Sequence, residues 1–132
     1  MGIGAPREPA DTRVAQRTRP LRALAIAAVL GALIWAITPL VSEVLEAWDA
    51  QGVYLPALLM SGLAGGWLAP RPLWAHYLGS YAGQLAYVAF VLGTDGMFLA
   101  GALLLFVYCL IALAGAWLGG ILRRQLSAPA RA

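Results

Sequence analysis

The chain has 132 residues, of which 61% are hydrophobic and only 11% charged, whereas about a quarter of residues are charged in soluble globular domains. This composition excludes an ordinary soluble domain and predicts an all-α integral membrane protein, a bundle of four transmembrane helices with short loops. All nine basic residues are arginine, in a background rich in alanine, glycine and leucine, which is typical of a GC-rich bacterial genome. We therefore expect a multi-pass protein of the bacterial inner (cytoplasmic) membrane.

Residues 1–20 are polar and rich in arginine and proline, and we expect them to form a disordered cytoplasmic tail. The first predicted span, at about 21–41, is longer than the apolar region of a signal peptide, so we interpret it as an uncleaved span. An acidic turn follows it. The second predicted span, at about 53–69, is short and begins near Tyr54, which we expect at the outer membrane interface.

The third predicted span, at about 72–93, carries more polar side chains than any other apolar segment. At about 100° per residue these side chains share one arc of the helix. A polar group facing hydrocarbon without a partner costs several kcal/mol, so this arc should face neighbouring helices or a wet cavity. The candidates for a polar face or pathway are His76, Ser80, Tyr81, Gln84 and Tyr87.

The fourth predicted span, at about 97–122, is the longest and most apolar, and a short cytoplasmic tail at 125–132 ends the chain. Small residues four positions apart let membrane helices approach closely. The helix-packing candidates are the pairs Gly62 and Gly66, Gly79 and Gly83, and Gly115 and Gly119. Their number predicts packing surfaces beyond those that one bundle needs, available for self-association or for a partner helix.

The residues between the second and third predicted spans, Pro70, Arg71 and Pro72, break the chain tightly. We therefore expect these two spans to form a helical hairpin. The sequence also repeats itself briefly, as LAGGWLA at 63–69 and LAGAWLG at 113–119, which leaves open whether a two-span hairpin was duplicated.

The arginines predict the orientation of the chain. In a four-span arrangement all nine lie on one side of the membrane, and the other side holds four acidic residues and no basic residue. The acidic residues of that side are Glu43, Glu46, Asp49 and Asp95. Both termini are therefore predicted to be cytoplasmic, inside the cell.

Catalytic, metal-binding and cofactor-binding residues are not apparent in the sequence, and we expect no enzyme activity. One histidine and one cysteine, on different predicted spans, fall short of the three or four ligands of a metal site. No carboxylate lies beside His76 to orient it as a catalytic base, and no phosphate-binding or nucleotide-binding motif occurs. We expect no cofactor and no nucleic-acid partner.

Two functions remain. Ion-coupled carriers usually keep an ionisable residue deep in the membrane, whereas Gln84 is the only strongly polar side chain near the middle of any predicted span here. We therefore favour a non-enzymatic accessory, assembly or scaffold subunit that works through helix packing, with the lipid bilayer and either a second copy or a larger membrane protein as partners. The alternative is a small oligomeric channel or transporter for a neutral or weakly polar solute, using the polar face of the third span.

Overall fold

The computed structural model describes residues 10–128, and all regular secondary structure in this range is helical. It contains four α-helices, one short 3-10 helix and one π-helical segment that continues the third α-helix. Their bounds are α1 Ala10–Val41, η1 Ala47–Asp49, α2 Gln51–Leu68, α3 Leu73–Tyr87, η2 Val88–Leu92 and α4 Phe98–Ser127. The prediction of an all-helical chain with four main helices is confirmed for the described residues.

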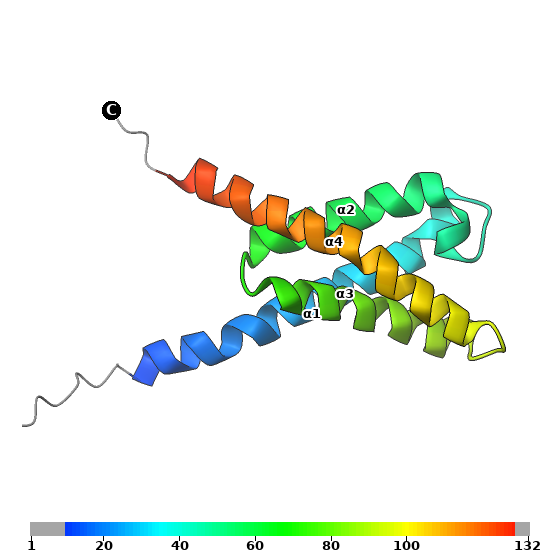
Figure 1. Ribbon diagram of the computed structural model, residues 1–132, viewed down its shortest axis with the longest axis horizontal. Helices are drawn as coiled ribbons and strands as arrows, with labels where there is room; N and C mark the ends of the chain where they lie inside the picture. The colour runs from blue at the N-terminus through cyan, green and yellow to red at the C-terminus, as the bar shows by residue number, and fades with distance from the viewer. Residues whose placement is uncertain (1–9, 129–132) are drawn as a thin grey trace, which may run out of the picture.

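The helices run alternately back and forth, so the beginning of α1 and the end of α4 lie at the same end of the molecule (Figure 1). Residues 1–9 lie outside the described range, but residues 10–20, which we expected to be disordered, belong to α1. The apolar part of α1 supplies the helix nucleus, and adding alanine, arginine and glutamine residues to an existing helix costs little. Helix α4 likewise continues beyond residue 122 to Ser127, with Arg124 in its last turn, where a basic side chain interacts favourably with the helix dipole.

Helices that are next but one in the chain make the closest pairs. Helix α1 packs along α3, and α2 packs along α4, while α2 and α3 hardly touch. The packed hairpin that we expected from the second and third apolar segments is therefore not formed. A tight turn fixes only how the chain reverses, whereas the side chains on each helix decide which neighbour it packs against.

Glycines bring α2 and α4 into backbone contact. A Cβ atom added to Gly62 or Gly66 would overlap the carbonyl group of Ala112 or Ala116, respectively. The contact is reciprocal: Gly115 and Gly119 lie against the carbonyl oxygens of Leu59 and Leu63 on α2. The two helices therefore approach as closely as their backbones allow, which gives extensive van der Waals contact. The segments 63–69 and 113–119, which resemble each other in sequence, lie on these two helices.

The α1 and α3 pair is built in the same way. Gly79 and Gly83 on α3 lie against the carbonyl oxygens of Leu24 and Ala28, and Gly31 on α1 lies against the carbonyl oxygen of Ser80. All six glycines that the sequence singled out thus contact neighbouring helices of the same chain. The surplus of small-residue surface that we expected on the outside is absent at these six positions.

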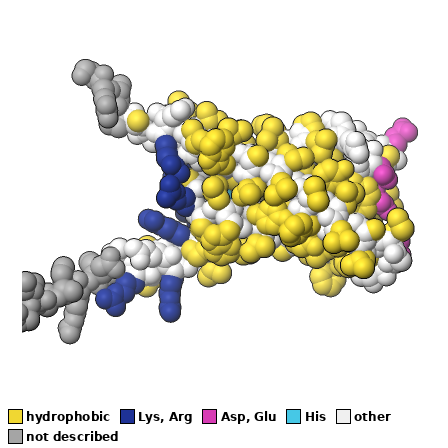
Figure 2. All heavy atoms as spheres, in the orientation of Figure 1, with side chains coloured by type: hydrophobic (Ala, Val, Ile, Leu, Met, Phe, Trp, Pro, Cys, Tyr) yellow, Lys and Arg dark blue, Asp and Glu magenta, His cyan; other side chains and the backbone are white. Residues whose placement is uncertain are grey.

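Large apolar side chains cover much of the outside of the bundle (Figure 2). Two helices, α1 and α4, are long and apolar enough to cross a membrane by length and composition, and only 28% of the apolar window of each is buried inside the fold. The arginines gather at the end of the molecule where α1 begins and α4 ends, and the acidic side chains visible in this view lie at the opposite end (Figure 2). The fold thus has an apolar middle and two ends of opposite charge.

Candidate functional site

The Gln84 amide, which is 0% exposed, is the centre of a hydrogen-bond cluster to which all four α-helices contribute. Its Oε1 accepts hydrogen bonds from the Trp35 indole Nε1 of α1, at 3.1 Å, and from the Tyr54 hydroxyl of α2, at 2.5 Å. Its Nε2 donates to the Ser80 hydroxyl one turn away on α3, at 3.2 Å, and to the Cys109 Sγ of α4, at 3.4 Å. We call these five side chains the Gln84 cluster.

The chemistry of the partners fixes how the amide is oriented. An indole N–H can only donate, so the Gln84 oxygen must be the atom that faces Trp35. A side-chain amide has two acceptor positions on oxygen and two donor hydrogens on nitrogen, and here all four are used. A buried polar network that is fully paired makes the surrounding packing rigid and specific, and it leaves no free position for a solute.

Aromatic rings enclose the acceptor side of the Gln84 cluster. The ring of Trp35 meets that of Trp48 edge to face, with centroids 4.8 Å apart, and lies 6.3 Å from the ring of Tyr54. The ring of Tyr54 in turn meets that of Tyr108 edge to face at 5.4 Å. Such pairs contribute about 0.5–1.5 kcal/mol each beyond the burial of their area. They also exclude water from the two hydrogen bonds to the Gln84 oxygen.

His76 lies one turn before Ser80 on the same face of α3 and is also buried. Its Nε2 lies 2.6 Å from the carbonyl oxygen of Ala69, near the end of α2. Since a carbonyl can only accept, Nε2 carries the proton and the Nδ1 of the neutral ring is an acceptor. That Nδ1 is buried and has no hydrogen-bond partner among residues 10–128. His76 is thus held at one nitrogen and unpaired at the other.

A small cavity of about 10 Å³ lies beside His76. His76, Ser61 and Ser80 contribute polar side chains to its wall, and the remaining lining is apolar or glycine. This volume corresponds to about one water molecule. Ser80 and His76 both form part of the wall of this cavity, and its volume offers no room for a larger solute.

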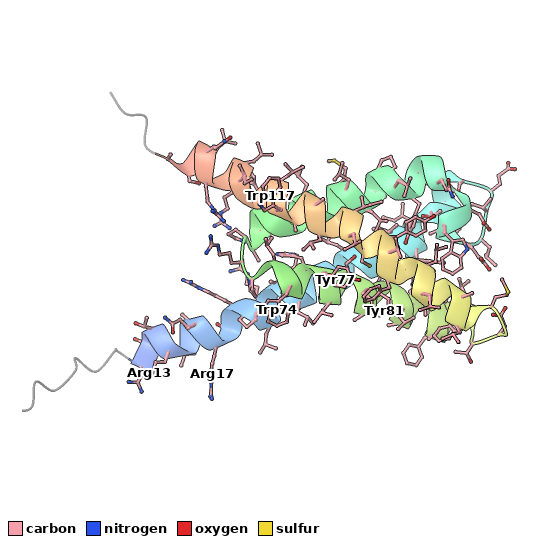
Figure 3. All side chains as sticks on the ribbon, in the orientation of Figure 1. Arg13, Arg17, Trp74, Tyr77, Tyr81 and Trp117 are labelled. Atoms are coloured by element: carbon pink, nitrogen blue, oxygen red, sulfur yellow. The ribbon has the colours of Figure 1, made fainter. Side chains whose placement is uncertain are left out.

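The structure brings together three of the five predicted polar residues, since His76, Ser80 and Gln84 share the buried face of α3. Tyr81 instead turns towards α4, where its hydroxyl donates to the Ala102 carbonyl, like that of Tyr77 to the Phe106 carbonyl (Figure 3). Tyr87 packs its ring near that of Trp35, with centroids 6.4 Å apart. The two tyrosines of the predicted set therefore flank the cluster and form no continuous polar path with it.

Sequence reasoning missed three members of the Gln84 cluster: Trp35, Tyr54 and Cys109. Trp35 carried a usable signal, because tryptophan favours membrane interfaces and this one lies well inside an apolar run. Tyr54 was expected at the outer interface, but it is fully buried and its hydroxyl points to the Gln84 oxygen. Its ring packs between those of Trp35 and Tyr108. Neither the helical period nor the position of Tyr54 within the predicted span reveals this contact.

The buried side chains provide no pair of nucleophile and base. The Ser80 hydroxyl accepts from Gln84, the Cys109 Sγ lies 4.0 Å from that hydroxyl, and no hydrogen bond joins His76 to either in the described structure. Between residues 10 and 128, no three His, Cys, Asp or Glu side chains group closely enough to hold a metal ion. The arrangement binds helices to one another through neutral hydrogen bonds.

Comparison with known proteins found no matching protein family, no matching curated protein and no matching solved structure.

Proposed function

We propose that this chain is a four-span protein of the bacterial inner membrane that acts without catalysis, as an accessory, assembly or scaffold subunit. The observation that carries the proposal is the Gln84 amide, whose four hydrogen-bonding positions are all taken by side chains of the same chain. A solute or substrate would have to displace these buried partners, which costs about 1–3 kcal/mol for each group left unpaired. Because every hydrogen-bonding position of Gln84 is occupied, this cluster favours a static helix bundle over a solute pathway or a catalytic site.

Several features support placing the bundle across a membrane. At 1.5 Å per residue, the 18 residues of α2 extend over about 27 Å, and α3 with η2, over residues 73–92, extends over about 30 Å. These lengths match the hydrocarbon core of a bilayer, which is about 30 Å thick. Helices α1 and α4 exceed it, and large apolar side chains are exposed around the middle of the fold.

The distribution of charge supports an orientation with both termini in the cytoplasm. Arginines lie at the end that holds the beginning of α1 and the end of α4, and Figure 2 shows acidic side chains at the other end. Cytoplasmic segments of membrane proteins carry an excess of arginine and lysine. The π-helical turn η2 and the turn at residues 93–97 would then face outwards, together with the segment at 42–50.

The packing also refines how a partner would be bound. The glycines of the three GxxxG pairs are used in contacts inside the chain, so they are not available to a second protein. A partner helix would instead contact the leucine-rich and tryptophan-rich outside of the bundle. Either a larger membrane protein or a second copy of this chain could cover such a surface.

Affinity purification tests the proposal. The tagged full-length protein is isolated from its native membrane in mild detergent, and accompanying proteins are identified by mass spectrometry. A stoichiometric complex with a larger membrane protein is the expected result. Isolation of the chain alone, as a single copy with no partner, would contradict the accessory role.

Cysteine labelling tests the orientation separately. Cys109 is buried and should not react with a membrane-impermeant maleimide, so single cysteines can be added to the wild-type chain. In intact cells with a permeable outer membrane, Asp95→Cys should react and Ser127→Cys should not. The reverse pattern would show that the orientation is wrong, and labelling of both would show that the chain does not span as proposed.

A channel or transporter for a small neutral solute is the second candidate, and one observation favours it. His76, whose Nδ1 has no hydrogen-bond partner among the described residues, lines the small cavity together with Ser61 and Ser80, and the Gln84 cluster does not pair this nitrogen. Liposome flux of water or a small neutral solute tests it. Flux that His76→Phe abolishes and that Trp74→Phe leaves unchanged would support the second function over the first.

A further inference from the structure

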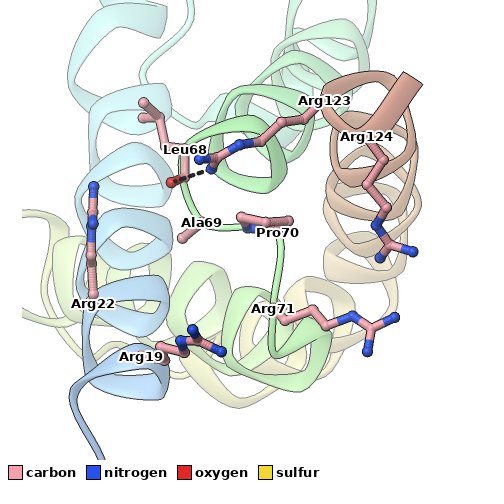
Figure 4. A pocket seen from close by; sticks show the side chains of 8 residues that line it. All are labelled: Arg19, Arg22, Leu68, Ala69, Pro70, Arg71, Arg123 and Arg124. Carbon is pink, nitrogen blue, oxygen red and sulfur yellow. Dashed lines mark hydrogen bonds between the residues drawn. The ribbon is translucent and has the colours of Figure 1, made fainter. Parts of the chain in front are cut away.

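A pocket of about 370 Å³ lies at the arginine end of the bundle, where three segments of the chain meet (Figure 4). The segments are the early part of α1, the turn between α2 and α3, and the end of α4. They contribute five arginines to its wall: Arg19, Arg22, Arg71, Arg123 and Arg124. Arg71 and Arg124 extend on the side bounded by α4, and the two arginines of α1 bound the opposite side (Figure 4).

One of these arginines has a structural role. The Nη1 of Arg123 donates to the carbonyl oxygens of Trp67, at 2.8 Å, and Leu68, at 3.1 Å, and so pairs the last carbonyls of α2. For the other four, no hydrogen bond to a carboxylate occurs within residues 10–128. They are exposed and free to engage a ligand.

The convergence of arginines creates a strong positive potential, and no acidic side chain of residues 10–128 is part of the pocket lining. Most acidic residues of the described chain lie in the segments at the opposite end (Figure 2). Helix α3 begins at Leu73 without a side-chain N-cap, so its free N–H groups add to the positive potential near Arg71. The guanidinium group presents several N–H donors in a plane that suits the oxygens of a phosphate group.

A separate apolar groove lies between α3 and α4. It has a volume of about 490 Å³ and is lined by Leu73, Trp74, Leu110, Leu113, Ala114 and Trp117. Arg71 lies two residues before Leu73, where the α3 wall of the groove begins, and Arg124 lies two helical turns after Trp117, on the same face of α4. Figure 3 shows Trp74 and Trp117 in the half of the bundle nearest the arginines.

We propose that the arginine pocket and this groove together bind one anionic phospholipid. The phosphate group lies between Arg71 and Arg124, and an acyl chain occupies the groove between Trp74 and Trp117. A free phosphate would use only the charged part, whereas a lipid matches the juxtaposition of charge and apolar surface. The inference rests on the proposed placement of the chain in a membrane.

Lipid titration with two matched double variants tests the charged part of the site. The full-length protein in non-ionic detergent is titrated with phosphatidylglycerol or with phosphatidylcholine of the same acyl chains, and bound lipid is counted by native mass spectrometry. Arg71→Gln with Arg124→Gln should weaken phosphatidylglycerol binding about twenty-fivefold, a factor of about five for each arginine near the phosphate. Arg123 is left in place because it pairs the end of α2.

The control removes the same charge elsewhere. Arg13 and Arg17 lie on α1 outside the lining of this pocket (Figure 3), and their double glutamine variant should weaken binding by less than about threefold, because exposed charges that do not contact the phosphate are screened by water and salt. Equal losses in the two double variants would overturn the proposal, since affinity would then follow net charge alone. Equal binding of phosphatidylcholine by the wild-type protein would overturn it as well.

A double variant of the groove tests whether the bound phosphate group belongs to a lipid. Trp74→Ala with Trp117→Ala should weaken phosphatidylglycerol binding and leave the binding of inorganic phosphate unchanged. If inorganic phosphate displaces phosphatidylglycerol at comparable concentration and the tryptophan variant binds both as the wild type does, the ligand is free phosphate and the lipid assignment fails. Far-UV circular dichroism confirms that each variant retains its helices.

The outcomes also separate this site from the proposed function. Absence of a partner protein in the purification would refute the accessory role and leave the lipid titration valid. A chain that remains in solution without detergent would refute the membrane placement, and with it both proposals. Loss of the lipid site alone leaves the Gln84 cluster and the accessory role unchanged.

Discussion

The glycine contacts and the Gln84 cluster join different helices, and they do so by different physical means. The glycines join α1 to α3 and α2 to α4 through direct backbone contact. The Gln84 cluster joins the two pairs to each other, since Trp35 and Gln84 belong to one pair and Tyr54 and Cys109 to the other. Formation of each pair thus depends on steric fit, and union of the pairs depends on buried hydrogen bonds, so the two can be disrupted separately.

The largest effect is expected from breaking a glycine contact. In Gly66→Val, the added atoms would overlap the carbonyl group of Ala116 and force α2 away from α4. We expect a loss of about 3 kcal/mol in the free energy of unfolding, at the upper end for overpacked sites. The measurement is unfolding of the protein in mixed detergent micelles by added dodecyl sulfate, followed by tryptophan fluorescence.

Gly52→Val is the matched control for this substitution. Gly52 lies in the first turn of the same helix, and nothing lies within 4 Å of the position that its Cβ atom would take. Both variants replace glycine by valine in the same helix. A small loss at Gly52 would therefore show that the larger loss at Gly66 comes from steric overlap with α4. A loss at Gly52 equal to that at Gly66 would show that the close contact of α2 and α4 does not limit stability.

A smaller loss is expected from removing the amide of the Gln84 cluster. Gln84→Met keeps a side chain of similar length but leaves the Trp35 indole and the Tyr54 hydroxyl buried without their acceptor. With about 1–3 kcal/mol for a buried unpaired group and partial relaxation of the two rings, we expect a loss of about 2 kcal/mol. The same unfolding titration measures it.

The control for this variant is Ala86→Met, on the exposed side of α3. It should change the free energy of unfolding by less than about 0.5 kcal/mol, as expected for surface positions. Tyr54→Phe combined with Gln84→Met should cost less than the sum of the two single losses, because both remove the same hydrogen bond. Full additivity would contradict the shared bond.

The sequence predicted the two kinds of contact to different degrees. Apolar runs located four helices, with the second predicted at about 53–69 and observed at Gln51–Leu68, because a helix must be long and apolar to be buried in hydrocarbon or in protein. The four-residue spacing of Gly62 and Gly66 indicated a close approach. It did not indicate the partner, since the spacing is satisfied by any helix that presents a small-residue surface.

The limits of prediction at the candidate site have a similar cause. The period of 3.6 residues placed His76, Ser80 and Gln84 on one face of α3, and the structure has all three buried on it. It could not show that all hydrogen-bonding positions of the Gln84 amide are paired whereas the Nδ1 of His76 is not, because partners such as Trp35 and Cys109 come from other helices. Saturation is a property of the assembled bundle.

A third prediction contrasts the two ends of this polar face. His76→Phe removes the donor to the Ala69 carbonyl, but it also removes the unpaired Nδ1, and the larger ring can enter the adjoining cavity. These terms partly offset one another, so we expect a loss of about 1 kcal/mol, less than that of Gln84→Met. A loss larger than that of Gln84→Met would mean that Nδ1 has a partner, such as a water molecule in the cavity.

The smallest effects are expected at Cys109, where the contribution of hydrogen bonding can be separated from that of size. Cys109→Ala removes the acceptor of one Gln84 N–H, while the Ser80 hydroxyl still accepts from the same nitrogen, so we expect a loss of about 0.5–1 kcal/mol. Cys109→Ser restores an acceptor, and its loss should stay below about 0.5 kcal/mol, since a hydroxyl accepts more strongly than a thiol. If serine instead destabilises more than alanine, the position acts as an apolar contact, and the bond between Gln84 and Tyr54 is then the hydrogen bond of the Gln84 cluster that joins the two helix pairs.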